Sequence, residues 1–269
     1  MRPFTGAIPD GAVVCDVRWT AAGGPDRAAF ERGHLPGARF VDLDADLAAP
    51  ATVAAGRHPL PAPDRFAAAI GRLGIGDGDT VIAYDGAGGT IAARLVWMLR
   101  VLGERAALLD ADLAGALTEQ GPGARWGERS FTARPWPAAA VASIDEAQAA
   151  GASLTEPLID GRPAGRFRGD EPANPLDPRP GHIPGARSLP VAANTGADGR
   201  LLPEPVLRAR YAAVGIGPGQ SFIASCGSGV TACHALLVAE QLGLGGGRLY
   251  PGSWSQYAAD PARPAATGD

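Results

Sequence analysis

One cysteine stands at the start of a loop whose residue types suit nucleophilic chemistry. Cys226 follows the apolar run "SFIAS" and precedes "GSGVT", after which "VTACHALLVAEQLG" has helical spacing. A helix start presents unpaired N–H groups with partial positive charge, which favours a thiolate. Gly227 and Gly229 can adopt conformations that turn successive amides inward, while Ser228 and Thr231 add uncharged hydroxyls. The run predicts a solvent-reachable nucleophile in a cradle of amides; the alternative is a small, buried and inert cysteine.

The remaining cysteines and the histidines indicate no second reactive centre. Cys15 falls inside an expected strand and Cys233 inside the expected helix, so we expect both in the core. Three scattered cysteines are too few for a disulfide framework or a structural zinc site. His58 and His234 lack metal-ligand spacing. The sequence therefore predicts no metal and no cofactor.

The chain contains two copies of one unit. "AVVCDVRW" is echoed by "PLIDGRP", which sets Asp16 against Asp160, and "GHLPGAR" at 33–39 returns as "GHIPGAR" at 181–187. "LGIGDGDTVIAYDG" at 73–86 then matches "VGIGPGQSFIASCG" at 214–227, which places Asp85 opposite Cys226. Three matches in the same order indicate a duplication. Because the first copy has a carboxylate where the second has a thiol nucleophile, the first copy is expected to be inactive.

Strands that alternate with helices in each copy predict two small α/β domains, each a parallel sheet flanked by helices. Amphipathic helices are expected in "PDRFAAAIGRLG" and "PEPVLRARYAAVG", and Ser143 with Glu146 has the spacing of a capping box. The expected organisation is an N-terminal domain, a linker rich in Gly, Pro and Arg, a catalytic C-terminal domain and a flexible tail, at residues 1–118, 119–142, 143–260 and 261–269.

Composition excludes several classes of function. The formal net charge of -4 supplies no basic field, so we expect neither nucleic acid nor a membrane surface as a partner. The sequence has no apolar run long enough to span a bilayer, and "MRPFTGAIPDG" lacks the apolar core of a secretory signal. We therefore expect a cytoplasmic location.

The paired units, the "GHxPGA" turns, "DGRPAGRFRG", "CGSGVTA" and "LYPGSWSQY" together resemble the two-domain rhodanese family of sulfurtransferases over nearly the whole chain. The resemblance implies two similar α/β domains and a persulfide-forming cysteine in the second. "CGSGVT" is similar to the 3-mercaptopyruvate sulfurtransferase branch, whereas the thiosulfate branch usually has two basic residues where Gly227 and Ser228 stand. A keto-acid monoanion is thus a better match than a dianionic donor.

The resemblance also implies the donor-binding residues. Arg166, in the "GRF" segment, corresponds to an arginine that binds the donor's anionic group. A second arginine usually follows nine residues later; here that position is Pro175, and the nearest candidate is Arg179. Arg162 and Arg168 are weaker alternatives. The loop residues Gly227, Gly229, Val230 and Thr231 are expected to contact the donor, and His34 to point toward the site, although a turn-stabilising role is equally open; His182 is expected to be structural.

The expected reaction has two steps. In the first, Cys226 takes a sulfur atom from 3-mercaptopyruvate to form a persulfide, while Ser228 hydrogen-bonds the donor carbonyl or relays a proton. In the second, a thiol such as reduced thioredoxin, or cyanide, removes that sulfur from Cys226. Thiosulfate is the alternative donor. A sulfur carrier or regulatory binding module without catalysis is a third possibility. A cysteine phosphatase is disfavoured because its loop needs an arginine at the sixth position after the cysteine, which here is Ala232.

Overall fold

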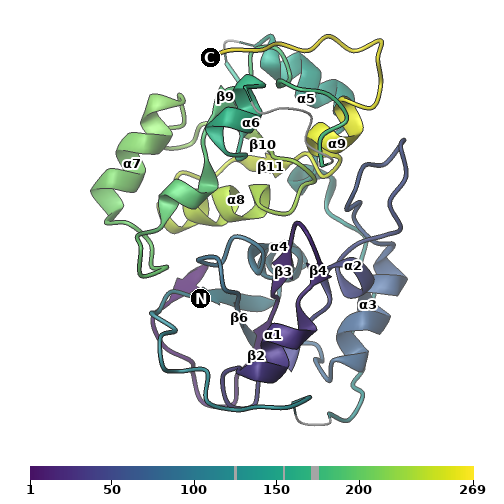
Figure 1. Cartoon of the computed structure of the whole chain (residues 1–269), viewed down its shortest axis with the longest axis vertical. Coiled ribbons are helices and arrows are strands. Elements are labelled where there is room, and N and C mark those ends of the chain that lie inside the picture. The colour runs from purple at the N-terminus through teal and green to yellow at the C-terminus, as the bar shows by residue number, and fades with distance from the viewer. Residues whose placement is uncertain (124–125, 154, 171–175) are drawn as a thin grey trace. The chain divides into compact units, whose positions relative to one another are not determined.

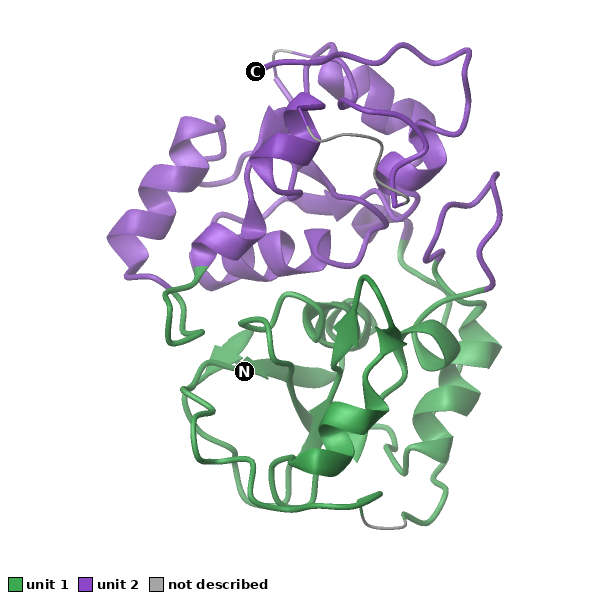
Figure 2. Cartoon of the chain, in the orientation of Figure 1, with its two compact units in different colours: residues 1–49, 60–137, 195–201 green, residues 50–59, 138–194, 202–269 purple. Residues whose placement is uncertain are grey.

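The computed structural model of the chain describes residues 1–123, 126–153, 155–170 and 176–269. These residues form two compact units with separate parallel sheets, which confirms the predicted pair of α/β domains (Figures 1 and 2). Unit 1 consists of residues 1–49, 60–137 and 195–201, and unit 2 of residues 50–59, 138–194 and 202–269.

Unit 1 is built on a five-stranded sheet whose strands all run parallel, in the order β1-β7-β6-β2-β5. Its strands are β1 (Phe4–Thr5), β2 (Val13–Asp16), β5 (Arg39–Phe40), β6 (Thr80–Tyr84) and β7 (Arg105–Leu109), with a separate antiparallel pair, β3 (Trp19–Thr20) and β4 (Gly24–Pro25). The helices are α1 (Arg27–Arg32), α2 (Leu43–Asp46), α3 (Pro63–Arg72) and α4 (Ala93–Val101). The central strand β6 is an apolar run buried on both faces, as parallel sheets require.

Unit 2 repeats this plan with the parallel order β11-β10-β8-β9. Its strands are β8 (Leu158–Asp160), β9 (Arg187–Ser188), β10 (Phe222–Ser225) and β11 (Gly247–Leu249). Its helices are η1 (Ala138–Ala140), α5 (Ile144–Gly151), α6 (Ala164–Arg168), η2 (Val191–Asn194), α7 (Glu204–Ala213), α8 (Ala232–Gln241) and α9 (Ser253–Tyr257). Helices α5 and α9 cover one face of the sheet and α8 the other (Figure 1).

Local sequence rules account for several of these elements. Ser143 and Glu146 form the predicted capping box at the start of α5, each side chain accepting a hydrogen bond from the backbone N–H of the other residue. Helix α3 starts at Pro63, whose fixed φ suits a first helical turn and whose missing N–H is not needed there. Within the described residues, no helix has the length and apolar character to cross a bilayer.

The units exchange short segments of chain. Residues 50–59 precede α3 in the sequence but pack in unit 2, and residues 195–201 pack in unit 1 (Figure 2). Each segment closes on itself through an antiparallel bridge, between Thr52 and Gly56 in the first and between Thr195 and Leu201 in the second. The compact units are therefore each made of more than one stretch of the chain.

The expected linker and tail both make ordered contacts. Residues 126–137 pack with unit 1, where the indole N–H of Trp136 donates to the carbonyl of Pro61 at 2.8 Å. In the tail, His182 and Ala266 exchange backbone hydrogen bonds of 2.9 and 3.0 Å, and the N–H of Gly268 donates to the carbonyl of Arg168. These bonds hold residues 266–268 against unit 2, so this part of the tail is not free.

Candidate active site

Cys226 lies at the carboxyl end of a central strand of unit 2. It directly follows β10, which pairs with β8 on one side and β11 on the other, and the loop then leads into α8. The carboxyl ends of parallel strands are where open α/β sheets bind ligands. The strand–loop–helix placement expected from "SFIASCGSGVT" is therefore the one observed.

Backbone contacts with the segment 249–257 fix this loop. The N–H of Cys226 donates to Ser253 Oγ at 3.1 Å, and its carbonyl accepts from the N–H of Trp254 at 3.0 Å. The carbonyl of Gly227 likewise accepts from the N–H of Ser255 at 2.9 Å. Ser253 itself has a φ of 49°, a left-handed conformation that is unusual for a residue other than glycine. The loop is thus held by a neighbouring segment as well as by its own sequence.

The sulfur of Cys226 receives one backbone hydrogen bond in the described structure, from the N–H of Gly229 at 3.1 Å. Gly229 has a φ of +74°, and a Cβ at this position would lie 2.3 Å from the carbonyl oxygen of Pro251. Only glycine therefore allows this amide to point at the sulfur. The residue Cys226 is just 2% exposed, which differs from the solvent-reachable thiol that the sequence predicts.

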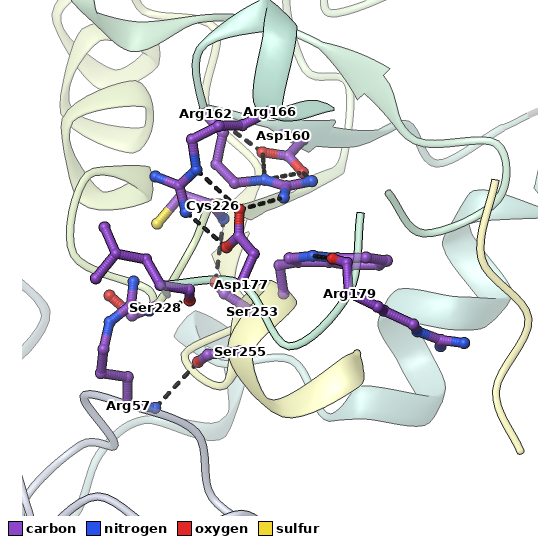
Figure 3. A network of polar contacts seen from close by, with 12 residues as sticks. Arg57, Asp160, Arg162, Arg166, Asp177, Arg179, Cys226, Ser228, Ser253 and Ser255 are labelled. Atoms are coloured by element: carbon purple, nitrogen blue, oxygen red, sulfur yellow. Dashed lines mark hydrogen bonds and ion pairs between the residues drawn. The ribbon is translucent and has the colours of Figure 1, made fainter. Parts of the chain in front are cut away.

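The guanidinium group of Arg166 lies near this buried sulfur. Arg166, on α6, donates from Nε and Nη2 to the carboxylate of Asp177 at 2.8 and 2.6 Å. Burial acts to lower the pKa of Arg166, but the hydrogen bond to Asp177 and the negative charges of Asp177 and Cys226 outweigh this effect. The pKa of Arg166 is therefore raised, and the side chain stays charged. Figure 3 shows Arg166 beside Cys226 and bonded to Asp177. The sulfur is thus buried, and Arg57 and Arg166 both lie near enough to interact electrostatically with it.

Arg162 serves a structural purpose close by. Its guanidinium donates to both oxygens of Asp160, the last residue of β8, and to the carbonyl of Gly181 at 2.7 Å. The side chain is almost fully buried. In unit 1, Arg18 forms the same bidentate pair with Asp16, so this pair belongs to the repeated fold.

The exchanged segment 50–59 brings two further polar side chains to the loop. His58 Nδ1 lies 2.8 Å from Ser228 Oγ, and both residues are buried. The backbone N–H of Arg57 donates to Ser255 Oγ at 3.0 Å, and its Nη1 donates to the carbonyl of Leu176. Figure 3 shows the Arg57 side chain rising from this segment toward Ser228. Sequence reasoning missed both residues, although "TVAAGR" at 52–57 and "TGADGR" at 195–200 carry a repeat signal.

Of the other residues predicted to bind the sulfur donor, some lie in the Cys226 loop and one points away from it. Val230 is buried and Thr231 is half-buried at the start of α8. Arg179 donates to the carbonyl of Arg263 at 2.6 Å and points away from Cys226 (Figure 3). The structure therefore does not bring Arg179 to the loop. Pro175, where the family pattern has its second arginine, lies outside the described residues.

The two repeated histidines have matching environments, each within its own unit. His34 stacks on Phe30 with ring centroids 3.9 Å apart, and its Nδ1 lies 2.9 Å from the carbonyl of Phe30. His182 stacks on Phe167 at 3.7 Å and has the same 2.9 Å contact with the carbonyl of Phe167. Identical contacts in both copies favour the turn-stabilising role for His34.

In unit 1 the carboxylate of Asp85 fills the position of the nucleophile. It follows β6 and accepts hydrogen bonds from four backbone N–H groups, those of Ala87, Gly89, Ile91 and Ala92, at 2.6 to 2.9 Å. Burial raises the pKa of Asp85, and the four amides oppose this rise. The loop of the first copy therefore encloses its own carboxylate and offers no thiol.

The other potential reactive groups lie in the core. Burial raises the pKa of Cys15 to about 12, and the thiol of Cys233 donates to the carbonyl of Gly229 at 3.3 Å inside the unit. Across residues 1–123, 126–153, 155–170 and 176–269, no three His, Cys, Asp or Glu side chains are grouped to hold a metal ion. Cys226 is thus the cysteine best placed for chemistry.

Comparison with known proteins supports the repeat and the fold. A model of the rhodanese-like domain matches residues 6–116 and again residues 141–260. The probable 3-mercaptopyruvate sulfurtransferase of Pseudomonas aeruginosa is 42% identical over 248 residues, which cover 89% of this chain and 86% of that protein. The putative thiosulfate sulfurtransferase SseB of Mycobacterium tuberculosis is 35% identical over 267 residues, which cover 96% of this chain and 92% of that protein.

A solved structure has a similar fold over most of this chain. The crystal structure of SseA from Escherichia coli, described as a 3-mercaptopyruvate sulfotransferase, superposes with a TM-score of 0.76 at 33% identity and covers 91% of this chain and 94% of that one. Both repeated units, their matching parallel sheets and the extent of these matches confirm the resemblance seen in the sequence. The chain belongs to the rhodanese-like family with two domains, and it is a sulfurtransferase.

Proposed function

We propose that the protein transfers a sulfane sulfur from 3-mercaptopyruvate, through a persulfide on Cys226, to a thiol acceptor or to cyanide. The observation that carries this proposal is the composition of the loop around the sulfur. Gly227 and Ser228 stand where a thiosulfate-type loop has basic residues, and Ser228 contacts His58. An uncharged hydroxyl paired with an imidazole suits a keto group better than a second negative charge.

In the first step the Cys226 thiolate attacks the sulfur of 3-mercaptopyruvate. A sulfur–sulfur bond forms as the carbon–sulfur bond breaks, and its electron pair passes to the donor as the enolate of pyruvate. The thiol proton of the donor stays with the new persulfide or passes to solvent, and a second proton adds to the enolate carbon to give pyruvate. Charge develops on the keto oxygen, where the hydroxyl of Ser228 can donate a hydrogen bond.

His58 makes the Ser228 hydroxyl a better hydrogen-bond donor in this step. With its Nδ1 2.8 Å from Ser228 Oγ, the imidazole can exchange a proton with the hydroxyl as negative charge forms on the keto oxygen of 3-mercaptopyruvate. The amide of Gly229 faces the sulfur and stabilises negative charge on it in the thiolate and persulfide states. Arg166 supplies positive charge near the donor's carboxylate.

In the second step a thiolate acceptor attacks the terminal sulfur and the Cys226 thiolate leaves. A dithiol acceptor such as reduced thioredoxin can then form its own disulfide and release hydrosulfide, whereas cyanide gives thiocyanate. The protein itself undergoes no net redox change. It needs a small-molecule donor and an acceptor, and no cofactor.

The test measures pyruvate and thiocyanate from 3-mercaptopyruvate with wild-type protein and with Cys226→Ser. We expect both products from the wild type and neither from the variant. No product from the wild type, or full activity in the variant, overturns the proposal. Thiosulfate is the second candidate donor because one relative is named for it; a larger kcat/KM for thiosulfate under the same acceptor would establish that alternative. A persulfide that forms without turnover would indicate a carrier.

A further inference from the structure

Helix α9 contacts both halves of the candidate site. Its residues hydrogen-bond the loop that carries Cys226 and Ser228. They also hydrogen-bond the exchanged segment 50–59, which carries His58. The nucleophile loop and the histidine that contacts it are therefore held by one element of unit 2.

Ser255 makes both connections at once. Its backbone N–H donates to the carbonyl of Gly227 at 2.9 Å, and its Oγ accepts the backbone N–H of Arg57 at 3.0 Å (Figure 3). Gly227 directly precedes Ser228 in the chain. Arg57 likewise directly precedes His58. Ser255 therefore links the two residues next to the Ser228–His58 pair, whose Oγ and Nδ1 are 2.8 Å apart.

The hydroxyl of Ser255 is fixed in the orientation that holds the segment. It donates to the carbonyl of Gly252 at 3.0 Å, which leaves its lone pairs to accept from Arg57. Gly56 packs against the same two groups, since a Cβ there would lie 2.8 Å from the carbonyl oxygen of Gly252 and 2.9 Å from Ser255 Oγ. The fit between Ser255 and the segment is thus close enough to set the segment's position.

Gln256 anchors the other end of the segment. Its Nε2 donates to the carbonyl of Ala54 at 2.6 Å, while its Oε1 accepts from the hydroxyl of Tyr250 at 2.8 Å. The side chain of Tyr250 is buried, so this bond orients the amide of Gln256. Segment 50–59 is therefore held by α9 at two points.

The segment has little apolar surface that could hold it in unit 2. Of residues 50–59, only Gly56 and His58 are buried, and Val53, in the turn after Thr52, is 77% exposed. One antiparallel bridge, between Thr52 and Gly56, closes the turn. Polar contacts therefore hold the segment, and the position of His58 depends on them.

We propose that Ser255 is a positioning residue for sulfur transfer: by holding Arg57, its hydroxyl keeps the imidazole of His58 against Ser228. This inference rests on the proposed function, in which that imidazole assists the Ser228 hydroxyl. Ser255 acts through His58 and is not itself a catalytic residue.

The test compares Ser255→Ala, His58→Ala and the double variant in the release of pyruvate from 3-mercaptopyruvate. Ser255→Ala removes the hydroxyl but keeps the N–H that holds Gly227, so the Cys226 loop stays in place. We expect kcat to fall by about 3- to 10-fold, the range of one neutral hydrogen bond, since Gln256 still anchors the segment. In the His58→Ala background the same change should alter kcat by less than about 2-fold, because no imidazole is left to position.

Ser143→Ala is the matched control. Its hydroxyl also accepts a backbone N–H in unit 2, that of Glu146 at 3.2 Å, but at the start of α5. Its kcat should be unchanged, although the lost helix cap lowers stability. Hydrogen exchange followed by mass spectrometry adds a readout that needs no turnover: residues 50–59 should exchange faster in Ser255→Ala than in the wild type, and at the wild-type rate in Ser143→Ala.

A loss of kcat that is as large in the His58→Ala background as in the wild type overturns the inference, as does an unchanged kcat in Ser255→Ala. A wild type that releases no pyruvate refutes the proposed function instead. Hydrogen exchange then tests the positioning of the segment by itself: faster exchange of residues 50–59 in Ser255→Ala supports it, and unchanged exchange refutes it.

Discussion

Gly229 should be the least replaceable residue of the loop after the nucleophile. Its φ of +74° costs any other L-residue about 1–2 kcal/mol. Its Cβ would also lie 2.3 Å from the carbonyl oxygen of Pro251 and 2.8 Å from the Cα of the same residue. Both are backbone atoms, so the clash cannot be relieved by a side-chain rotation and adds about 1–3 kcal/mol of overpacking.

Gly243 provides a matched control in the same unit. It follows α8 with a φ of +66°, and a Cβ there would meet no atom within 4 Å. Gly243→Ala should therefore show the backbone cost alone, and Gly229→Ala that cost plus the clash. In urea unfolding followed by tryptophan fluorescence, we expect Gly229→Ala to lose about 1–3 kcal/mol more stability than Gly243→Ala.

Activity should separate the two variants further. Relief of the clash moves the amide that lies 3.1 Å from Cys226 Sγ, so sulfur transfer should fall by at least about 10-fold in Gly229→Ala at a temperature where it is folded. Gly243→Ala should keep its activity. Equal stability losses and equal rates in the two variants would refute the assignment of Gly229 as the residue that aims an amide at the sulfur.

Three further predictions follow from individual contacts. Ser228→Ala and His58→Ala should each lower kcat by about 100-fold, and the double variant should be little worse than either, because the two groups act as a unit; additive losses would contradict this. Asp85→Ala leaves four amides without their acceptor and should destabilise the protein by about 2–5 kcal/mol in calorimetry, with kcat per folded molecule unchanged. Hydrogen bonds from the N–H of Ser143 and from the Arg248 guanidinium lower the pKa of Glu146 from 4.5 to about 2, so stability from this carboxylate is present above pH 4.5 and lost as pH falls toward 2. Glu146→Gln should flatten that part of the pH–stability curve, and an unchanged curve would contradict the prediction.

The sequence predicted the parts of the site that depend on local pattern. An apolar run ending at Ser225, glycines around Ser228 and helical spacing after Thr231 define a strand, a loop and a helix from neighbouring residues alone. The duplication then identified Asp85 as the counterpart of Cys226, and both follow the equivalent strands β6 and β10. Such features need no knowledge of long-range packing.

Arg57 and His58 reach the Cys226 loop through an exchanged segment, which hydrophobic periodicity cannot reveal. Residues 50–59 belong to the first repeat by sequence, yet they pack in unit 2. The similarity of Arg57 to Arg200, each at the end of a "TxAxGR" pattern, is a repeat signal, but it carries no information about which unit the segment contacts. That assignment needed the three-dimensional structure.

The burial of the sulfur has a similar cause. Glycines and a helix start predict an open cradle, whereas the observed loop is closed by hydrogen bonds from Trp254 and Ser255 and flanked by the Arg166–Asp177 pair. These partners lie far from Cys226 in sequence. Their contacts follow from the packing of unit 2, not from the loop motif.

Mass spectrometry of the protein after incubation with 3-mercaptopyruvate tests the central claim most directly. The account predicts that the peptide containing Cys226 gains the mass of one sulfur atom, that Cys15 and Cys233 stay unmodified, and that cyanide restores the original mass. An unmodified Cys226, or sulfur found on either of the other two cysteines instead, would contradict it.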